Sequence, residues 1–574
     1  MGDPSDAQEL PEKILKRELY EFARRRKTDY PYNDNLEVDV LIIGAGFGGT
    51  YLLYEMRKAG FKTVLYEAGT SFGGTWRWNV YPGARVDSEV PIYQLGIPEV
   101  YKTWTWTTNY PDYHELQAYF DHVDQVCNLS KDCAFESVVI SSEFDTNSGK
   151  WTVKTADGRT AKAKYLIIAA GFAAKRYIPD YPSMEKFKGI MHHSSFWPPE
   201  GVNANGKRVA IIGTGASGVQ MIQEWGPCAE HLTVFQRTPN LALPMGKRDM
   251  TKAEQEALYP AYPDLMRMRE CNFAGFTYDF EERNTFEDTP EEREAVYERL
   301  WKKAGFALWL GSHKDYLFDM KANRCVYDFW QKKQAPRVKN PEKRALLIPE
   351  EPPHAFGIKR PCLEQNYFEV LDRDNVTIVD ISEKGGVKIE EFTETGIKTS
   401  DGKHHEFDII ALATGFDITT GGMTNMGLKS IHGTTLQDEW RKAAYTYLGT
   451  TISGYPNMFH LYGPQGPTLM PPVLANGPTA VEVQGRWIRD AIKLIDRQGL
   501  KYINPTQEAS QKWKTRINEL SDMTLLPTTR STYMGGSVPG KAFEAVNYTG
   551  GIPEYIKEIR AVLPSFAGFE TVKA

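Results

Sequence analysis

The sequence predicts an α/β protein with two Rossmann-like dinucleotide-binding domains and a helical insert in the second of them. The apolar, β-branched run at 38–43 leads into the turn GAGFGG, then a segment with helical spacing, then a second apolar run that ends at Glu67. Residues 207–238 repeat this order of strand, glycine turn, helix and strand. Two such units in one chain predict two dinucleotide sites.

Length and charge narrow the class of protein further. The chain has 574 residues, which at roughly 150 residues per domain allows about four structural units. Its 68 basic and 74 acidic side chains give a net charge of −6, which does not favour binding to nucleic acid. The sequence contains no run of about 18 apolar residues, and its amino terminus is too polar for a secretion signal. We therefore expect a cytoplasmic, globular protein without nucleic-acid or membrane partners, and favour a monomer.

The first glycine turn has the composition of a pyrophosphate site. Gly44, Gly46 and Gly49 permit a tight bend, close approach of the backbone to a pyrophosphate, and close packing of the helix on the strand. Glu67 follows Gly44 by 23 residues, where an acid can accept hydrogen bonds from ribose hydroxyls. The alternative is a glycine turn without a ligand. Because strand, helix and acid are in register, we expect a site for an unphosphorylated ribose.

The second glycine turn differs at the position that selects the ribose. Gly213, Gly215 and Gly218 form the turn, and Arg237, followed by Thr238, stands 24 residues after Gly213 in place of an acid. A guanidinium can pair with a 2′-phosphate that an acid would repel, so NADP is favoured over NAD. A surface arginine is the alternative. Together the two sites indicate FAD and NADP as cofactors, with hydride passing from NADPH to the flavin.

The cysteines bear on what takes the electrons from the flavin. The six cysteines, at 127, 133, 228, 271, 325 and 362, include neither a CxxC pair nor metal-finger spacing. We therefore expect neither a dithiol partner for the flavin nor a metal site. Oxygen remains as the natural acceptor, which predicts an oxidoreductase that uses O2.

The rest of the chain is expected to alternate between the two domains. Strand-turn-strand patterns lead into AKYLIIAAG and FDIIALATG and return the chain to a sheet. Charge-rich helical spacing and two capping boxes, Thr251 with Glu254 and Thr289 with Glu292, mark a helical insert. A helix is predicted from about 478 to 498, between turn-rich segments that we expect over a site. The predicted parts are an N-terminal helical extension (1–37), the FAD-binding domain (38–180 and 400–574), the NADP-binding domain (181–245 and 331–399) and the helical insert (246–330).

Two motifs resemble those of a known family. The segment FKGIMHHSSFWP, residues 187–198, fits the pattern FxGxxxHxxxWP of the Baeyer-Villiger monooxygenases through Phe187, Gly189, His193, Trp197 and Pro198. The segment GGTWRWNVYPGARVD resembles a second family signature, GGxW followed by YPGxxxD, and the resemblance covers nearly the whole chain. It implies that Gly74, Thr75, Trp76 and Asp87 contact cofactor.

The resemblance also implies a reaction. NADPH reduces FAD, O2 adds to the reduced flavin to give a C4a-peroxyflavin, and this peroxide attacks a ketone carbonyl. Carbon migration then gives an ester or lactone while NADP+ stays bound, and thioethers are possible further substrates. Related monooxygenases that oxygenate nitrogen or sulfur end the first motif differently, so Trp197-Pro198 favours the ketone-oxidising branch. An N- or S-oxygenating enzyme, and an FAD- and NADP-binding sensor without turnover, are the alternatives.

The resemblance assigns roles to single residues as well. Arg360 matches the catalytic arginine, Asp87 the carboxylate beside it, and Lys359 a contact of the NADP phosphate, while His193 belongs to a linker and acts through conformation. A fixed cation suits an anionic peroxide and oxyanion, which agrees with the role of Arg360.

The same resemblance indicates a substrate pocket. Thr468, Leu469 and Met470 fall on a loop that lines this pocket in the family, although Leu469 and Met470 could equally pack the flavin domain. Thr532 stands where a tryptophan is usual in the family, which predicts a roomier pocket or a weaker hold on NADP+.

Overall fold

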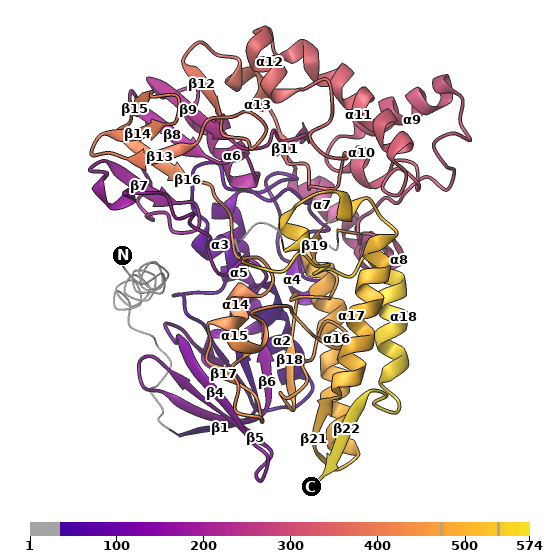
Figure 1. The fold of residues 1–574 in the computed structure, drawn as a ribbon. Coiled ribbons are helices and arrows are strands. Elements are labelled where there is room, and N and C mark those ends of the chain that lie inside the picture. The colour runs from indigo at the N-terminus through magenta and orange to yellow at the C-terminus, as the bar shows by residue number, and fades with distance from the viewer. Residues whose placement is uncertain (1–34, 471–472, 475, 536–539) are drawn as a thin grey trace.

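The computed structural model describes residues 35–470, 473–474, 476–535 and 540–574 (Figure 1). The predicted N-terminal extension therefore lies outside the described residues, apart from its last three positions. Two of these already belong to strand β1 (Leu36–Ile43), so the first domain begins slightly earlier than expected. Within the described part of the chain, no helix combines the length and apolar character needed to cross a membrane.

The first sheet is built around β1, whose residues from Val40 to Ile43 are buried. Its strands follow the order β17-β4-β5-β6-β1-β2-β3, and β18 pairs with β6. Strand β1 runs parallel to both β2 and β6, as expected for a dinucleotide-binding domain. The other strands are β2 (Thr63–Tyr66), β3 (Cys133–Ala134), β4 (Val139–Asp145), β5 (Lys150–Thr155), β6 (Thr160–Ile168), β17 (Leu428–Lys429) and β18 (Met458–His460).

The second sheet has five parallel strands in the order β12-β9-β8-β16-β7. Helix α6 (Ala216–Trp225) follows β8 through the second glycine turn, as α2 (Phe47–Lys58) follows β1 through the first. An antiparallel three-stranded sheet precedes β16 in the chain. The strands are β7 (Ile190–His193), β8 (Arg208–Ile212), β9 (His231–Gln236), β12 (Val376–Asp380) and β16 (Ile409–Leu412), with β13 (Ile389–Phe392), β14 (Gly396–Thr399) and β15 (His404–Glu406) in the small sheet.

Strand β16 corrects one predicted boundary. Residues from 400 onward were expected to return to the FAD-binding domain, yet β16 pairs with β8 and β7 in the second sheet. All four of its residues are buried, as in a central parallel strand. The chain therefore returns to the first sheet only after Leu412.

The helical insert lies beside the second sheet (Figure 1) and extends further than predicted. Thr289 and Glu292 form the complete capping box that the sequence predicts. Thr251 accepts the backbone N–H of Glu254, but the Glu254 carboxylate pairs with Arg248. The helices continue past the expected end at residue 330: α7 (Lys252–Leu258), α8 (Tyr262–Cys271), α9 (Pro290–Lys303), α10 (Ala307–Leu310), α11 (Met320–Gln334) and α12 (Pro341–Leu347).

Three helices near the C-terminus run side by side and cover the first domain (Figure 1). They include α16 (Gly477–Arg497), which matches the helix predicted from about 478 to 498 and packs against α2. The other two are α17 (Gln507–Asp522) and α18 (Ile552–Val562). The remaining elements are α3 (Thr75–Trp78), α4 (Pro98–Tyr101), α5 (Tyr113–Cys127), α13 (Tyr367–Leu371), α14 (Gly421–Thr424), α15 (Leu436–Glu439), β10 (Leu243–Pro244), β11 (Leu363–Glu364), β19 (Leu469–Met470), β20 (Val473–Leu474), β21 (Leu500–Pro505) and β22 (Phe569–Lys573).

Candidate active site

The first glycine turn has the tight bend and the close helix-on-strand packing that the sequence predicts. Gly44 has φ 102°, and a Cβ on it would lie 2.5 Å from the carbonyl oxygen of Ala169. A Cβ on Gly49 would lie 1.7 Å from the Gly44 carbonyl oxygen, so only glycine permits this helix-on-strand packing. Gly46 caps α2 without a side-chain hydrogen bond, which leaves the N–H groups of the first helical turn available to a pyrophosphate.

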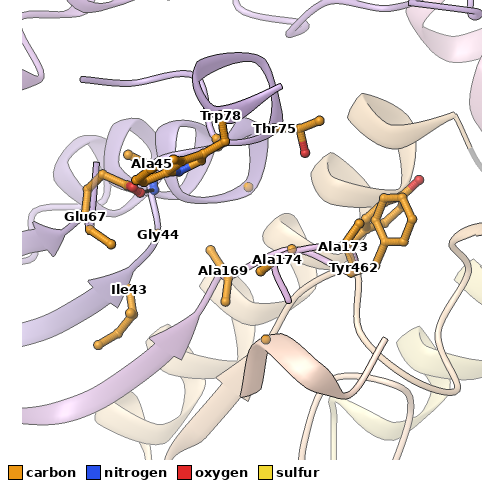
Figure 2. A pocket seen from close by; sticks show the side chains of 18 of the residues that line it. Ile43, Gly44, Ala45, Glu67, Thr75, Trp78, Ala169, Ala173, Ala174 and Tyr462 are labelled. Atoms are coloured by element: carbon orange, nitrogen blue, oxygen red, sulfur yellow. Dashed lines mark hydrogen bonds between the residues drawn. The ribbon is translucent and has the colours of Figure 1, made fainter. Parts of the chain in front are cut away.

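A cavity of about 370 Å³ opens at this turn. It extends from Gly44 and Glu67 on one side to Tyr462 on the other (Figure 2). Gly74, Thr75 and Trp76 line it as well, and a Cβ on Gly74 would lie 2.6 Å from the Gly46 Cα. The second family signature thus forms part of the cavity wall, and turn, helix terminus and cavity together fit an elongated dinucleotide such as FAD.

Glu67 has an additional role that spacing did not indicate. One of its carboxylate oxygens accepts the backbone N–H of Ala45 and the other that of Gly69, each at 2.6 Å. Burial raises the pKa of Glu67, while these backbone hydrogen bonds act in the opposite direction. Glu67 therefore fixes the shape of the turn, and its contact with a ribose stays a prediction.

The second glycine turn repeats the geometry of the first. Gly213 has φ 110°, and a Cβ on Gly218 would lie 2.1 Å from the Gly213 carbonyl oxygen. Gly215 caps α6 without a side-chain hydrogen bond, and a Cβ placed on it would have no heavy atom within 4 Å. This open helix terminus fits a second pyrophosphate.

Two cations lie together at the ribose end of the second turn. Burial, and then the positive charge of Arg237, lower the pKa of Lys359 to about 8. The carbonyl oxygen of Thr238 accepts the Thr214 hydroxyl at 2.7 Å, which fixes the end of β9 beside the turn. Two cations that repel each other are stabilised by a shared dianion, so this arrangement fits the 2′-phosphate of NADP.

Arg360 and Asp87 form an ion pair between segments 273 residues apart. The Arg360 Nε donates to one Asp87 oxygen at 3.1 Å, and Nη2 donates to the other. The side chains are 12% and 21% exposed, and the guanidinium lies 4.9 Å from the centre of the Phe306 ring. Burial by itself lowers the pKa of Arg360, but Asp87 and nearby tyrosines raise it above its ordinary value. The site therefore contains a permanent, oriented cation.

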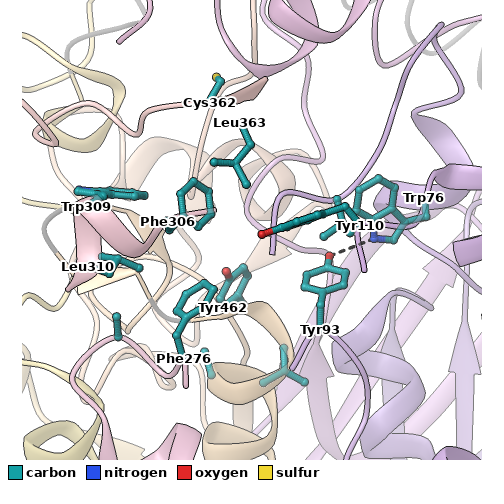
Figure 3. Close-up of a cluster of buried hydrophobic side chains, with 14 of the residues drawn as sticks. Trp76, Tyr93, Tyr110, Phe276, Phe306, Trp309, Leu310, Cys362, Leu363 and Tyr462 are labelled. Carbon is teal, nitrogen blue, oxygen red and sulfur yellow. Dashed lines mark hydrogen bonds between the residues drawn. The ribbon is translucent and has the colours of Figure 1, made fainter. Parts of the chain in front are cut away.

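Aromatic side chains connect this cation to the cavity. Tyr93 and Tyr462 both line the cavity and both interact electrostatically with Arg360. Trp76 donates its indole N–H to the Tyr93 hydroxyl at 3.0 Å (Figure 3). Phe276, Phe306, Trp309 and Leu310 of the helical insert belong to the same buried hydrophobic cluster as Trp76, Tyr93 and Tyr462 (Figure 3). Trp76 belongs to the GGxW signature, but sequence reasoning did not identify Tyr93, Tyr462 or the residues of the insert, because no motif contains them.

The segment 187–198 lies at the edge of the second sheet. A Cβ on Gly189 would lie 2.5 Å from the Phe187 ring and 2.6 Å from the Asp408 carbonyl oxygen, so glycine is required there. Trp197 is buried against Trp225 of α6, with ring centroids 5.5 Å apart. Pro198 follows and accepts the backbone N–H of Gly201 at 2.9 Å. These residues pack the domain, whereas Ser195 and Phe196 of the same segment line the cavity.

His193 bridges two parts of the chain. Its Nδ1 accepts the Ser195 backbone N–H at 3.1 Å, so its Nε2 is the donor, 3.1 Å from the Gly415 carbonyl oxygen. Burial, and then the charge of Arg176, lower the pKa of His193 to about 4. His193 is therefore neutral near pH 7, which agrees with a linker residue.

The predicted substrate-pocket residues lie in the C-terminal part of the chain. Thr468 is buried, and both its backbone N–H and its hydroxyl hydrogen-bond to Asn547 Oδ1. Leu469 and Met470 form strand β19 against β20. Thr532 begins a 3₁₀ turn, Thr532–Met534. The contact of these four residues with substrate stays a prediction.

Two glycine-rich dinucleotide folds, with a buried arginine at the junction, define a flavin- and nicotinamide-dependent oxidoreductase. Residues 38–259 match the family model described as pyridine nucleotide-disulphide oxidoreductase. The chain is 54% identical over 560 residues to an FAD-binding monooxygenase, acrE, of Aspergillus aculeatus, covering 98% of this chain and 93% of that protein. It is 41% identical over 536 residues to cyclopentanone 1,2-monooxygenase of Comamonas sp., covering 93% and 96%.

The solved structure of cyclohexanone monooxygenase from Rhodococcus sp. Phi1 bound to NADP+ has a similar fold. Its TM-score is 0.89 at 32% sequence identity, and the match covers 94% of this chain and 100% of that one. The chain belongs to the Baeyer-Villiger monooxygenase family and is an FAD- and NADPH-dependent monooxygenase.

Proposed function

We propose that this enzyme inserts one oxygen atom of O2 between the carbonyl carbon of an apolar ketone and a neighbouring carbon, which gives an ester or lactone. The observation that carries the proposal is the Arg360-Asp87 ion pair, whose guanidinium interacts electrostatically with Tyr93 and Tyr462, two residues that line the cavity. FAD, once reduced by NADPH, supplies the activation of O2. A cytoplasmic, monomeric enzyme is part of the proposal and rests on composition alone.

Arg360 provides a positive charge where negative charge develops on oxygen. Because a guanidinium does not lose its proton, the cation is present throughout the working pH range. Asp87 orients the guanidinium through two hydrogen bonds, so the group is already placed when the anion forms. A preorganised donor of this kind typically lowers a barrier by about 3 kcal/mol.

The walls of the site restrict water and select the substrate. The Phe306 ring lies under the Arg360 guanidinium, and Phe276 and Leu310 belong to the same buried hydrophobic cluster as Phe306 (Figure 3). Exclusion of water strengthens the interaction of Arg360 with an anion and protects reactive oxygen species from side reactions. Relatives act on cyclopentanone or are named for cyclohexanone, which supports small cyclic ketones as the first substrates to test.

Product analysis tests the proposal directly. NADPH consumption is followed with cyclopentanone, cyclohexanone and a methyl phenyl thioether, and products are assigned as lactone, sulfoxide or hydrogen peroxide. We expect a lactone from at least one ketone, with sulfoxide as a side activity. Sulfoxide without lactone across a wider ketone panel would instead indicate an S-oxygenating enzyme. Substrate-independent formation of peroxide alone would indicate an oxidase.

A further inference from the structure

The two segments that connect the domains lie side by side. Residues 172–177 lead from the first sheet to the second and residues 414–419 lead back, and we call them the crossing. The Asp417 N–H donates to the Lys175 carbonyl oxygen at 2.8 Å, and the Tyr177 N–H donates to the Gly415 carbonyl oxygen at 2.9 Å. The same Gly415 oxygen faces His193 Nε2. Any change in the relative placement of the two domains therefore passes through this pair of segments.

The side chain of Asp417 connects the crossing to a distant part of the chain. It is 11% exposed and forms an ion pair with Lys541, while the Lys175 Nζ lies 3.9 Å away. The Lys541 Nζ also donates to the Thr420 hydroxyl at 2.5 Å. A Cβ on Gly421, which lines the cavity, would lie 2.7 Å from the Asp417 Cγ. The carboxylate is thus packed behind the cavity wall and bonded to an ammonium group from the C-terminal region.

Lys541 is in turn connected to Tyr533. The Glu544 N–H donates to the Met534 carbonyl oxygen at 3.1 Å and brings the two described parts of this region together. Tyr533 lies beside Arg360, and the two groups interact electrostatically. Burial raises the pKa of Tyr533 to about 12, so the group beside the guanidinium is a neutral hydroxyl.

We propose that the Lys541-Asp417 ion pair is a positioning pair that keeps Tyr533 beside Arg360 while the crossing has the arrangement described here. For its catalytic consequence the proposal rests on the proposed function. When Lys541 loses Asp417, Tyr533 is less firmly placed and water reaches Arg360. A larger share of O2 then takes two electrons from NADPH and two protons to give hydrogen peroxide, and less is used for the ester.

A second anchor makes the pair testable without unfolding the region. Glu544 forms an ion pair with Lys514 of α17 and accepts the Ala444 N–H at 2.9 Å. This anchor stays intact when Lys541 is replaced, so the region remains attached to the first domain. Lys512, also on α17, is 76% exposed and forms an ion pair with Glu508 of the same helix, which makes it a matched control lysine.

The experiment compares Lys541→Met, Lys541→Arg and Lys512→Met in the full-length, FAD-loaded enzyme. Hydrogen exchange of peptides that contain Tyr533 or Lys541 is measured with saturating NADP+, and peroxide is measured per NADPH consumed with a ketone. In Lys541→Met we expect exchange about fivefold faster or more, and a peroxide share about threefold higher, in the range of a lost charged hydrogen bond. Lys541→Arg and Lys512→Met should behave like the wild type.

Exchange and peroxide share equal to those of Lys512→Met would overturn the proposal. Failure of Lys541→Arg to restore either quantity would also overturn the role of the ion pair, because arginine retains the charge. Asp417→Asn is a second test, since its effect should not add to that of Lys541→Met. If the wild type makes no ester from any ketone, the proposed function fails, while the exchange experiment still decides whether the pair holds Tyr533.

Discussion

Replacement of Arg360 by alanine is the most direct test of the proposed chemistry. The substitution removes the cation but leaves Asp87 in place, 21% exposed and without the guanidinium that donates a hydrogen bond to each of its carboxylate oxygens. It also removes the charge that lies over the Phe306 ring. An anion formed beside this position would then lie next to the Asp87 carboxylate instead of the Arg360 guanidinium.

The size of the effect follows from the burial of the pair. Two unit charges about 4 Å apart interact by about 4 kcal/mol at an effective dielectric constant of 20, a value suited to partly enclosed groups. With 12% of the Arg360 side chain exposed, we take about 3 kcal/mol as the loss, which corresponds to a rate lower by roughly 100- to 1,000-fold.

The assay measures ester or lactone formation and NADPH oxidation separately. We expect Arg360→Ala to retain FAD, to oxidise NADPH, and to lose ester formation by the factor above. The rate of ester formation by Arg360→Lys should lie between those of Arg360→Ala and the wild type, because an ammonium keeps the charge but not the paired hydrogen bonds. Arg208→Ala removes another ion-paired arginine, bonded to Asp408 and Glu406, and should leave ester formation unchanged. A folded Arg360→Ala enzyme that forms ester within about twofold of the wild type would refute the reasoning.

Three further predictions concern the cofactor sites and the pocket. Because Lys359 loses its proton near pH 8, the KM for NADPH should rise as the pH increases through that value. Lys359→Met should raise the KM for NADPH about tenfold at pH 7 and leave the KM for NADH unchanged. Steady-state kinetics measures both values. Gly218→Ala places a carbon 2.1 Å from a carbonyl oxygen and should abolish NADP binding in calorimetry while FAD content stays normal; Gly215→Ala, with open space at that carbon, should fold like the wild type. Thr532→Trp should narrow the range of bulky ketones and lower peroxide formation, and unchanged values of both would contradict a roomier pocket.

Much of the fold could be predicted because the backbone of a glycine turn requires glycine at fixed positions, which are recognisable in the sequence. Gly44 and Gly213 adopt positive φ and sit where no Cβ fits, so the residue type itself reports the backbone shape. Strand β16 shows the limit of this reasoning. A buried parallel strand is apolar on both faces, and its sequence does not indicate which of two sheets it joins. The helix at 341–347, in contrast, had readable signals in Asn340 and Pro341 at its start.

The active site was less accessible to sequence reasoning than the cofactor sites. Arg360 and Asp87 are 273 residues apart, and nothing local in either segment indicates that they meet. Only resemblance to a family paired them. The aromatic wall from Phe276 and Phe306 comes from the helical insert, whose spacing predicts helices but not the surface they face. Non-local packing of this kind is decided by the whole fold.

The ion pair at the centre of the site also joins the two domains. Asp87 belongs to the first domain, on the segment after α3, whereas Arg360 lies on the segment before β11, which pairs with β10 beside the second glycine turn. The cation is therefore oriented only when both domains are in the placement described here. An arginine held by a carboxylate from the other domain thus couples the orientation of this cation to the relative placement of the two domains.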